Sequence, residues 1–178
     1  MIKPFIRITI YSLLISLSSA TLMGQKYSDS ISVNLFLLDE CKITQYMIPE
    51  LQELYDTYQS DNIQFVAYFS NFSSKPPKIE AFVEDYKLPM AIKTDYYKTR
   101  ARLLGASVAP EVVVYDEKNQ KILYQGRISN AYAKIGTRRR VVTQHDLKNS
   151  LQAIIEHKEI ETPVTTAIGC YINFNELN

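Results

Sequence analysis

The sequence predicts an α/β protein in which a central mixed β-sheet is flanked by helices and followed by an extended C-terminal tail. Apolar runs typical of buried strands alternate with segments that repeat apolar residues at helical spacing. A β-hairpin and a last helix follow, and this order favours a mixed sheet with helices on its faces. With 178 residues, 46% of them hydrophobic, the chain can form one domain with a proper core.

The first half of the chain alternates strands with helices. ISVNLFLL and IQFVAYFS are β-branched and apolar, and both are too short for ordinary helices. Between them apolar residues recur at helical spacing, and Pro49 inside that segment is expected to kink the helix. A loop with two adjacent prolines leads into a short amphipathic helix. The elements predicted here are a strand at 31–38, a helix at 41–58, a strand at 63–70 and a helix at 79–86.

The second half predicts a short strand and helix, a β-hairpin, a long loop and a last helix. Gly105 is placed to cap the short helix, and the turn DEKNQ separates the two hairpin strands. Leu147, Leu151, Ile154 and Ile155 give the last helix one apolar face. The elements predicted here are a strand at 88–95, a helix at 99–105, strands at 108–116 and 121–128, and a helix at 145–157.

The first 24 residues have the pattern of a secretory signal peptide. Lys3 and Arg7 precede an apolar run of about a dozen residues, small residues follow, and no acidic residue occurs before Asp29. Cleavage after Gly24 or after Ala20 fits this pattern; the alternative is an uncleaved anchor, for which the apolar run is short. We therefore expect an exported protein, periplasmic or secreted, with a signal peptide at 1–24, a domain at 25–162 and a tail at 163–178.

The charge balance gives no reason to expect nucleic acid or an anionic membrane as a partner. Removal of residues 1–24 takes away two basic residues and leaves 18 basic against 19 acidic residues. The run from Arg138 to Arg140 is the one local exception. Three arginines beside Gly136 and Thr137 are more typical of a solvated loop than of a binding patch.

Cys41 lies where a buried strand is followed by a helix. A helix N-terminus offers unpaired N–H groups and a partial positive charge, which favour a thiolate and can lower a cysteine pKa from about 8.5 to roughly 3.5–7.5. Lys42 adds to this effect, whereas Asp39 and Glu40 oppose it. The hydroxyl of Thr44 lies one turn along and is placed to donate to the sulfur. The alternative is an inert buried cysteine, which is less expected because a helix N-terminus is seldom fully buried.

Pro110 lies near the start of the first hairpin strand, and Glu111 separates it from the apolar run 112–114. A proline there fits a cis Ala109–Pro110 bond, which proteins keep where the surrounding structure enforces it. It also fits an ordinary trans proline that begins an edge strand. The spacing alone leaves both forms open.

Together these features resemble the thioredoxin-like fold and, more narrowly, the redoxin-domain (AhpC/TSA-like) proteins of exported bacterial type. The active-site stretch of that group typically reads Glu-Cys-Pro-Ile-Ser followed by Pro-Glu-Leu; here 40–44 are Glu-Cys-Lys-Ile-Thr and 49–51 are Pro-Glu-Leu. Val-Ala-Pro-Glu at 108–111 is similar to the group's Val-Thr-Pro-Glu. The similarity extends to Gly126-Arg127-Ile128, Thr143, Asp146, Leu147 and 166–170, and covers about residues 30–172. It implies a cis Pro110 packed against the active-site sulfur.

The chain also departs from this pattern. Thr44 stands where thioredoxins have the second cysteine of Cys-x-x-Cys. Leu38 replaces the Thr or Ser of peroxiredoxins, and Pro110-Glu111 stands where they have an arginine, so peroxide reduction is not implied. Arg127 of the next strand is the remaining arginine that could approach the site. Copper-delivery relatives need Cys-x-x-x-Cys, which is missing here.

Cys170 in the tail is the candidate for the missing second thiol. The tail is long enough to fold back over the active edge of the sheet, and Thr165, Thr166 and Gly169 suit an extended segment with a tight turn. Cys170 would then close a reversible bridge with Cys41. The alternative is a structural disulfide, which stabilises the fold by about 4–5 kcal/mol in the chain-entropy model. Both interpretations stay open at this point.

We therefore expect an exported thiol–disulfide oxidoreductase in which Cys41 attacks, Cys170 resolves, Thr44 donates to the thiolate and Pro110 shapes the substrate groove. The expected partners are a protein or small-molecule thiol or disulfide and an unknown reductant. No cofactor, metal or nucleic acid is expected, and no membrane after signal cleavage. One alternative is a non-catalytic binding module with a structural Cys41–Cys170 disulfide; a soft metal site of Cys41, Cys170 and His145 is a weaker one.

Overall fold

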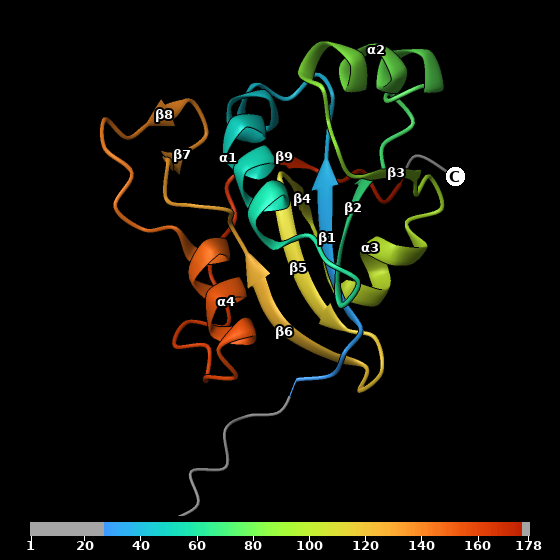
Figure 1. Ribbon diagram of the computed structural model, residues 1–178. Helices are drawn as coiled ribbons and strands as arrows, with labels where there is room; N and C mark the ends of the chain where they lie inside the picture. The colour runs from blue at the N-terminus through green and yellow to red at the C-terminus, as the bar shows by residue number, and fades with distance from the viewer. Residues whose placement is uncertain (1–26, 176–178) are drawn as a thin grey trace, which may run out of the picture.

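A mixed five-stranded sheet forms the centre of the molecule (Figure 1), in a computed structural model that describes residues 27–175. Its first three strands are parallel to one another, the fourth is antiparallel to the third, and the fifth is antiparallel to the fourth. The order is β3 (Ala91–Thr94), β2 (Ile63–Phe69), β1 (Ile31–Leu37), β5 (Glu111–Asp116) and β6 (Lys121–Gly126). The predicted mixed sheet flanked by helices is thereby confirmed. The predicted signal peptide lies outside the described residues.

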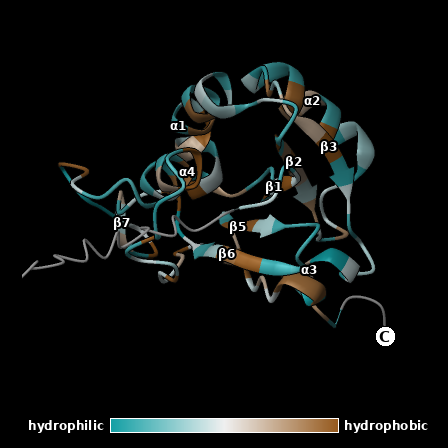
Figure 2. Cartoon of the chain, turned by 60° about the horizontal axis from the view of Figure 1, so that its bottom comes forward, coloured by the Kyte–Doolittle hydropathy of each residue, from teal (hydrophilic) through white to brown (hydrophobic). Residues whose placement is uncertain are grey.

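Helices cover both faces of this sheet (Figure 2). On one face lie α1 (Lys42–Tyr58), α2 (Pro76–Tyr86) and α4 (Asp146–Ile155), and on the other lies α3 (Thr99–Leu104). Val112 and Val114 of β5 pack into the larger core with α1, whereas Val113 and Tyr115 pack into the smaller core with α3. Because both faces are buried, the central strands read as continuous apolar runs rather than as alternating patterns.

The elements predicted from the sequence are present, with bounds that differ by a few residues. The second helix begins at Pro76 rather than at residue 79, because proline suits the first turn of a helix. α1 runs through Pro49 without interruption, and Gly105 caps α3 in the left-handed conformation (φ 69°). The predicted strand at 108–116 is divided at Pro110 into β4 (Val108–Ala109) and β5.

The predicted long loop between β6 and α4 contains a small hairpin that the sequence did not indicate. Its strands are β7 (Tyr132–Lys134) and β8 (Thr137–Arg138). Gly136 takes φ +75° in the turn, a conformation that residues with a side chain rarely adopt. The strands are too short to show a two-residue periodicity, which explains why a loop was predicted.

The C-terminal tail returns across the sheet. The N–H of Gln125 in β6 donates to the carbonyl of Pro163 at 2.9 Å, and the N–H of Thr165 donates to the carbonyl of Gln125 at 2.9 Å. Further on, β9 (Cys170–Tyr171) pairs antiparallel with β4, and Ile172 is buried in the smaller core. The tail therefore covers the end of the sheet where β4 and the start of α1 lie. Within residues 27–175, no helix has the length and apolar character needed to cross a membrane.

Candidate active site

Cys41 is the N-cap residue of α1 and follows β1 after a short turn. The turn is closed by the N–H of Cys41, which donates to the carbonyl of Leu38 at 3.0 Å. The helix starts when the N–H of Gln45 donates to the carbonyl of Cys41 at 3.0 Å. The apolar strand and the helix thus fix the backbone on both sides of the sulfur, as the sequence predicted.

The Cys41 side chain is only 3% exposed, so the expectation that a helix N-terminus leaves it accessible is wrong. Its thiol donates to the carbonyl of Ala109 at 3.5 Å, and residue 170 of the tail lies against it. The expectation of an accessible Cys41 took account only of its own helix, α1. The burial comes from β4 and β9, which reach Cys41 from distant parts of the chain.

Pro110 follows a cis peptide bond to Ala109, the form that the resemblance implied. The loop around it is held by the buried carboxylate of Glu111, which accepts the N–H groups of Ser107 at 2.8 Å and Val108 at 3.3 Å. Glu111 also accepts a hydrogen bond from the side chain of Gln125 at 3.1 Å. The carbonyl of Ala109 is thereby presented to Cys41. The sequence indicated no role for Glu111 beyond its place in the Val-Ala-Pro-Glu motif and its charge at the start of an apolar strand.

Cys170 brings a second thiol to this position. Its Sγ atom lies 3.0 Å from that of Cys41, although the two residues are 129 positions apart, and both are free thiols. The pairing of β9 with β4 sets this distance, because Cys170 stands opposite Ala109 in the register. A disulfide bond is about 2.05 Å long, so the sulfurs need approach each other by only about 1 Å to form one.

Gly169 allows the tail to approach the cis-proline loop this closely. A Cβ atom on Gly169 would lie 2.3 Å from the carbonyl oxygen of Ala109 and 2.9 Å from the nitrogen of Pro110. These atoms belong to the backbone, so a side chain at this position has no room. The sequence predicted a tight turn at Gly169, but residues 165–169 form no turn in the structure, and the glycine serves instead for close contact with β4.

Several polar side chains that the sequence did not single out hold the tail in place. The hydroxyl of Tyr124 lies 2.7 Å from that of Thr165, which also accepts the N–H of Arg127 at 3.1 Å. The side chain of Asn71 donates to the carbonyl of Tyr171 at 3.1 Å and accepts the N–H of residue 173 at 2.9 Å. Neither Tyr124 in an apolar strand nor Asn71 in a polar loop carries a sequence signal for this role.

The two thiols differ in acidity. Burial alone would raise the pKa of Cys41, but hydrogen bonds from the Cys170 thiol and from the backbone N–H groups of Thr44, Ile43 and Cys170 outweigh it, so the pKa is lowered. Burial raises the pKa of Cys170 to about 11, together with its hydrogen bond to Cys41 and the charge on that sulfur. The proton therefore stays on Cys170 and the thiolate forms on Cys41.

Thr44 is fully buried in the first turn of α1. Its hydroxyl accepts the N–H of Leu38 at 3.5 Å, which ties the helix to the end of β1. The contribution of Thr44 to the sulfur comes from its backbone N–H, whereas the sequence had suggested the hydroxyl.

Two further candidates are engaged elsewhere. The Nε atom of Arg127 lies 2.8 Å from the carboxylate of Asp146, and Nδ1 of His145 lies 2.9 Å from that of Glu50. Neither residue contacts a cysteine through these groups. Among the described residues, no three His, Cys, Asp or Glu side chains are grouped so as to hold a metal ion, and the soft site with His145 is not formed.

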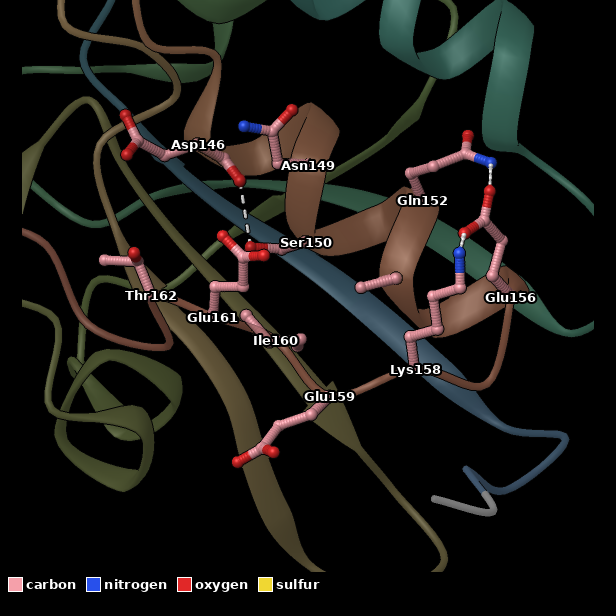
Figure 3. A pocket seen from close by; sticks show the side chains of 11 residues that line it. Asp146, Asn149, Ser150, Gln152, Glu156, Lys158, Glu159, Ile160, Glu161 and Thr162 are labelled. Atoms are coloured by element: carbon pink, nitrogen blue, oxygen red, sulfur yellow. Dashed lines mark hydrogen bonds and ion pairs between the residues drawn. The ribbon is translucent and has the colours of Figure 1, made fainter. Parts of the chain in front are cut away.

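Two hollows are candidate places for a substrate to bind, and they differ in size and in the residues that line them. The one beside Pro110, bordered by Met47, Tyr132 and Ile168, has a volume of about 10 Å³, which is about the space of one water molecule. A larger cavity of about 290 Å³ lies between α4 and residues 156–162 (Figure 3), and neither cysteine lines it. There the carboxylate of Glu156 pairs with Lys158 at 2.6 Å. Within residues 27–175, the hollow beside Pro110 therefore has no room for a substrate while the tail is in place.

No family model matches this sequence, and no curated protein matches it either. Solved structures do match. An uncharacterized conserved protein from Geobacillus kaustophilus has a TM-score of 0.73 and 22% identity, over 84% of this chain and 79% of the other. A thioredoxin-like protein in the oxidized form has a TM-score of 0.56 and 15% identity, over 75% and 82%. A secreted disulfide oxidoreductase from Mycobacterium tuberculosis has a TM-score of 0.51 and 14% identity, over 71% and 83%.

These similarities establish that the chain has the thioredoxin-like fold, as the resemblance in the sequence implied. Cys41 directly precedes α1, and the cis bond before Pro110 separates β4 from β5. Membership in the narrower redoxin-domain group stays a prediction from the motifs alone.

Proposed function

We propose that the protein is a thiol–disulfide oxidoreductase in which Cys41 attacks the substrate and Cys170 resolves the intermediate. The observation that carries this proposal is the 3.0 Å distance between two free thiols of opposite pKa shift, one at a helix N-terminus and one on the returning tail. A helix N-terminus favours the thiolate that such chemistry needs. The secreted oxidoreductase with the same fold adds support.

The first step is attack of the Cys41 thiolate on one sulfur of a substrate disulfide. A bond forms between Cys41 and that sulfur, the substrate S–S bond breaks, and the other substrate sulfur leaves as a thiolate that takes up a proton. The product is a mixed disulfide on Cys41. The N–H groups that lower the pKa of Cys41 ensure that its thiolate is available for this step.

In the second step Cys170 attacks the Cys41 sulfur and expels the remaining substrate thiolate. Burial raises the pKa of Cys170, and the hydrogen bond to Cys41 and the charge on that sulfur raise it further, to about 11. A mixed disulfide on Cys41 carries no charge, so the two contributions of Cys41 disappear, burial alone remains, and Cys170 loses its proton more readily. The substrate is thereby reduced to two thiols and the protein is oxidised to a Cys41–Cys170 disulfide, which a dithiol reductant reopens.

The tail must move for a substrate to reach Cys41. The sulfur is buried, and the hollow beside Pro110 has room for about one water molecule. Displacement of β9 would uncover both Cys41 and the edge of β4. Pro110 then shapes the uncovered groove, and Thr44 keeps the start of α1 in position. Substrates of this site are thiols or disulfides on proteins or small molecules.

Export of the protein is part of the proposal. The pattern of residues 1–24 supports a signal peptide, which would leave the domain at 25–162 and the tail at 163–178 in a periplasmic or extracellular location. Such compartments are oxidising, so a protein with two adjacent thiols can exchange disulfides there.

The second candidate function is a binding module in which Cys41 and Cys170 form a permanent disulfide. The firm attachment of the tail favours it, because Ile172 is buried and Thr165 is held by two hydrogen bonds. The lowered pKa of Cys41 favours exchange instead, because a structural disulfide needs no stabilised thiolate.

Cys170→Ser and Cys170→Ala are expected to differ in the pKa of Cys41, with the lower value in the serine variant. A serine hydroxyl keeps a donor beside the Cys41 sulfur, whereas alanine removes it, and a donor to a thiolate lowers its pKa. Alkylation of Cys41 by iodoacetamide measured against pH gives this pKa, because only the thiolate reacts. The pH at which the alkylation rate of Cys41 reaches half its maximum should be higher in the alanine variant than in the serine variant. Equal midpoints would contradict the role of the Cys170 side chain as donor.

A further inference from the structure

The segment 129–144 between β6 and α4 concentrates positive charge. It contains Lys134, Arg138, Arg139 and Arg140 and no acidic residue, so the rest of the chain has 16 basic against 19 acidic residues. We call this segment the basic hairpin segment, because β7 and β8 lie within it. Its charge is opposite in sign to that of the remainder of the protein.

The base of the basic hairpin segment is fixed by a buried amide. Asn130 accepts the N–H of Thr143 at 3.0 Å and donates to its hydroxyl at 2.8 Å, and it also accepts the N–H of Gln144 at 3.2 Å. Next to it, Ser129 donates to the carboxylate of Glu50 in α1 at 2.6 Å. These contacts join the two ends of the segment to each other and to α1. The segment that carries the four cations is therefore attached at a defined place on the molecule.

The four cations themselves are exposed, and none forms an ion pair with any other residue in 27–175. Ile135 and Val141 lie among them and are 64% and 68% exposed. A surface that mixes unpaired cations with exposed aliphatic side chains fits a polypeptide with acidic residues. The phosphate backbone of a nucleic acid has no apolar side chains to bury against Ile135 and Val141.

The basic hairpin segment borders the thiol site. The guanidinium of Arg138 lies over the ring of Tyr46 at 4.9 Å, and the ring of Tyr132 meets Tyr46 edge-on at 5.6 Å. Tyr132 also lines the hollow beside Pro110. Figure 1 shows β7 and β8 beside α1, at the end of the molecule where β4 and β9 lie. A chain bound at the edge of β4 can therefore extend across these cations.

We infer that the basic hairpin segment binds acidic stretches of polypeptide substrates and so positions their disulfides for Cys41. This inference rests on the proposed exchange function and adds the class of substrate: proteins with acidic residues close to the cysteine that is attacked. Opposite charges increase the rate of encounter and the affinity, and salt weakens both. The three arginines, expected from the sequence to be a solvated loop, are in this view a recognition surface.

The test compares two peptides with the same disulfide, one flanked by glutamates and the other by glutamines. The wild-type protein should have a KM for the acidic peptide about tenfold lower at low ionic strength, since a few exposed ion pairs give a difference of that order. Added salt should reduce this preference. The variant Lys134→Gln/Arg139→Gln/Arg140→Gln should lose it, with kcat little changed. Arg138 is kept because it stacks on Tyr46.

The control variant Lys93→Gln/Lys118→Gln/Lys121→Gln removes three exposed cations from other parts of the surface and should keep the preference. Equal KM values for both peptides, with turnover intact, would overturn this inference but leave the proposed exchange function standing. Absence of turnover with either peptide would refute the proposed function, and the inference with it. Binding to vesicles of equimolar phosphatidylserine and phosphatidylcholine that is lost in the hairpin variant, without any peptide preference, would assign the surface to a membrane and overturn the inference.

Discussion

Cys170→Ser is expected to accumulate a mixed disulfide between Cys41 and the substrate, whereas Cys41→Ser is expected to abolish exchange. Serine at 170 keeps a donor beside Cys41 but cannot form a disulfide, so the second step is blocked after the first has occurred. Serine at 41 removes the attacking thiolate, so neither step occurs. In the proposed cycle each sulfur has one role, so the two variants should stop the reaction at different steps.

Intact-mass measurement after incubation with oxidised glutathione distinguishes these outcomes. Cys170→Ser should carry one glutathione, located on Cys41 by peptide mapping, and Cys41→Ser should carry little or none because the pKa of Cys170 is raised by burial. Wild-type protein should instead form the internal bridge. A stable adduct on Cys170 in the Cys41→Ser variant, at a rate equal to that of Cys41, would reverse the assigned roles.

Gly169→Ala is expected to detach β9 and expose Cys41. The added Cβ would lie 2.3 Å from the carbonyl oxygen of Ala109 and 2.5 Å from its carbon, so the backbone of the tail cannot keep its place beside β4. Cys41 is buried because of that pairing. At about pH 9, where much of an ordinary thiol is ionised, alkylation of Cys41 should be at least about tenfold faster than in the wild type. Formation of the internal bridge should be slower.

Tyr171→Ala is the matched control for this variant. Tyr171 belongs to the same strand, and its side chain is 78% exposed, so its removal leaves the pairing of β9 with β4 intact. Its alkylation rate at Cys41 should equal that of the wild type. If Gly169→Ala also behaved like the wild type, the tail would not be what covers Cys41.

Local sequence patterns were sufficient to predict the main elements and the position of Cys41. An apolar strand followed by a helix repeat places a residue at the helix N-terminus whatever the rest of the chain does. The glycine at position 105 likewise marks a helix end through its own conformation. The motif around Pro110 predicted the cis bond only through its resemblance to a known fold.

Features that depend on contacts between distant segments could not be predicted in this way. The burial of Cys41 and the steric limit at Gly169 arise where β9 meets β4, about 60 residues earlier in the chain. The roles of Asn71 and Tyr124 in holding the tail exist only once the tail has folded back. The hydrogen bonds by which Asn130 fixes the base of the basic hairpin segment likewise depend on residues 13 and 14 positions further along the chain.

The pKa difference between the two cysteines connects the geometry with the proposed cycle. Stabilisation of the Cys41 thiolate favours the reduced form of the pair, and a disulfide whose reduced form is stabilised is opened more easily. A purely structural bridge has the opposite requirement, because it has to resist reduction. The same two sulfurs can therefore be assigned to one role or the other by their redox equilibrium.

The measurement that tests this account most directly is a redox titration of the protein with cysteine mapping at each step. The account predicts a single Cys41–Cys170 bridge that forms and opens reversibly, and that a reductant of thioredoxin strength, at about −270 mV, reduces. A bridge that stays closed below about −300 mV would identify a structural disulfide and contradict the exchange function. Two thiols that never become linked would contradict the resolving role of Cys170.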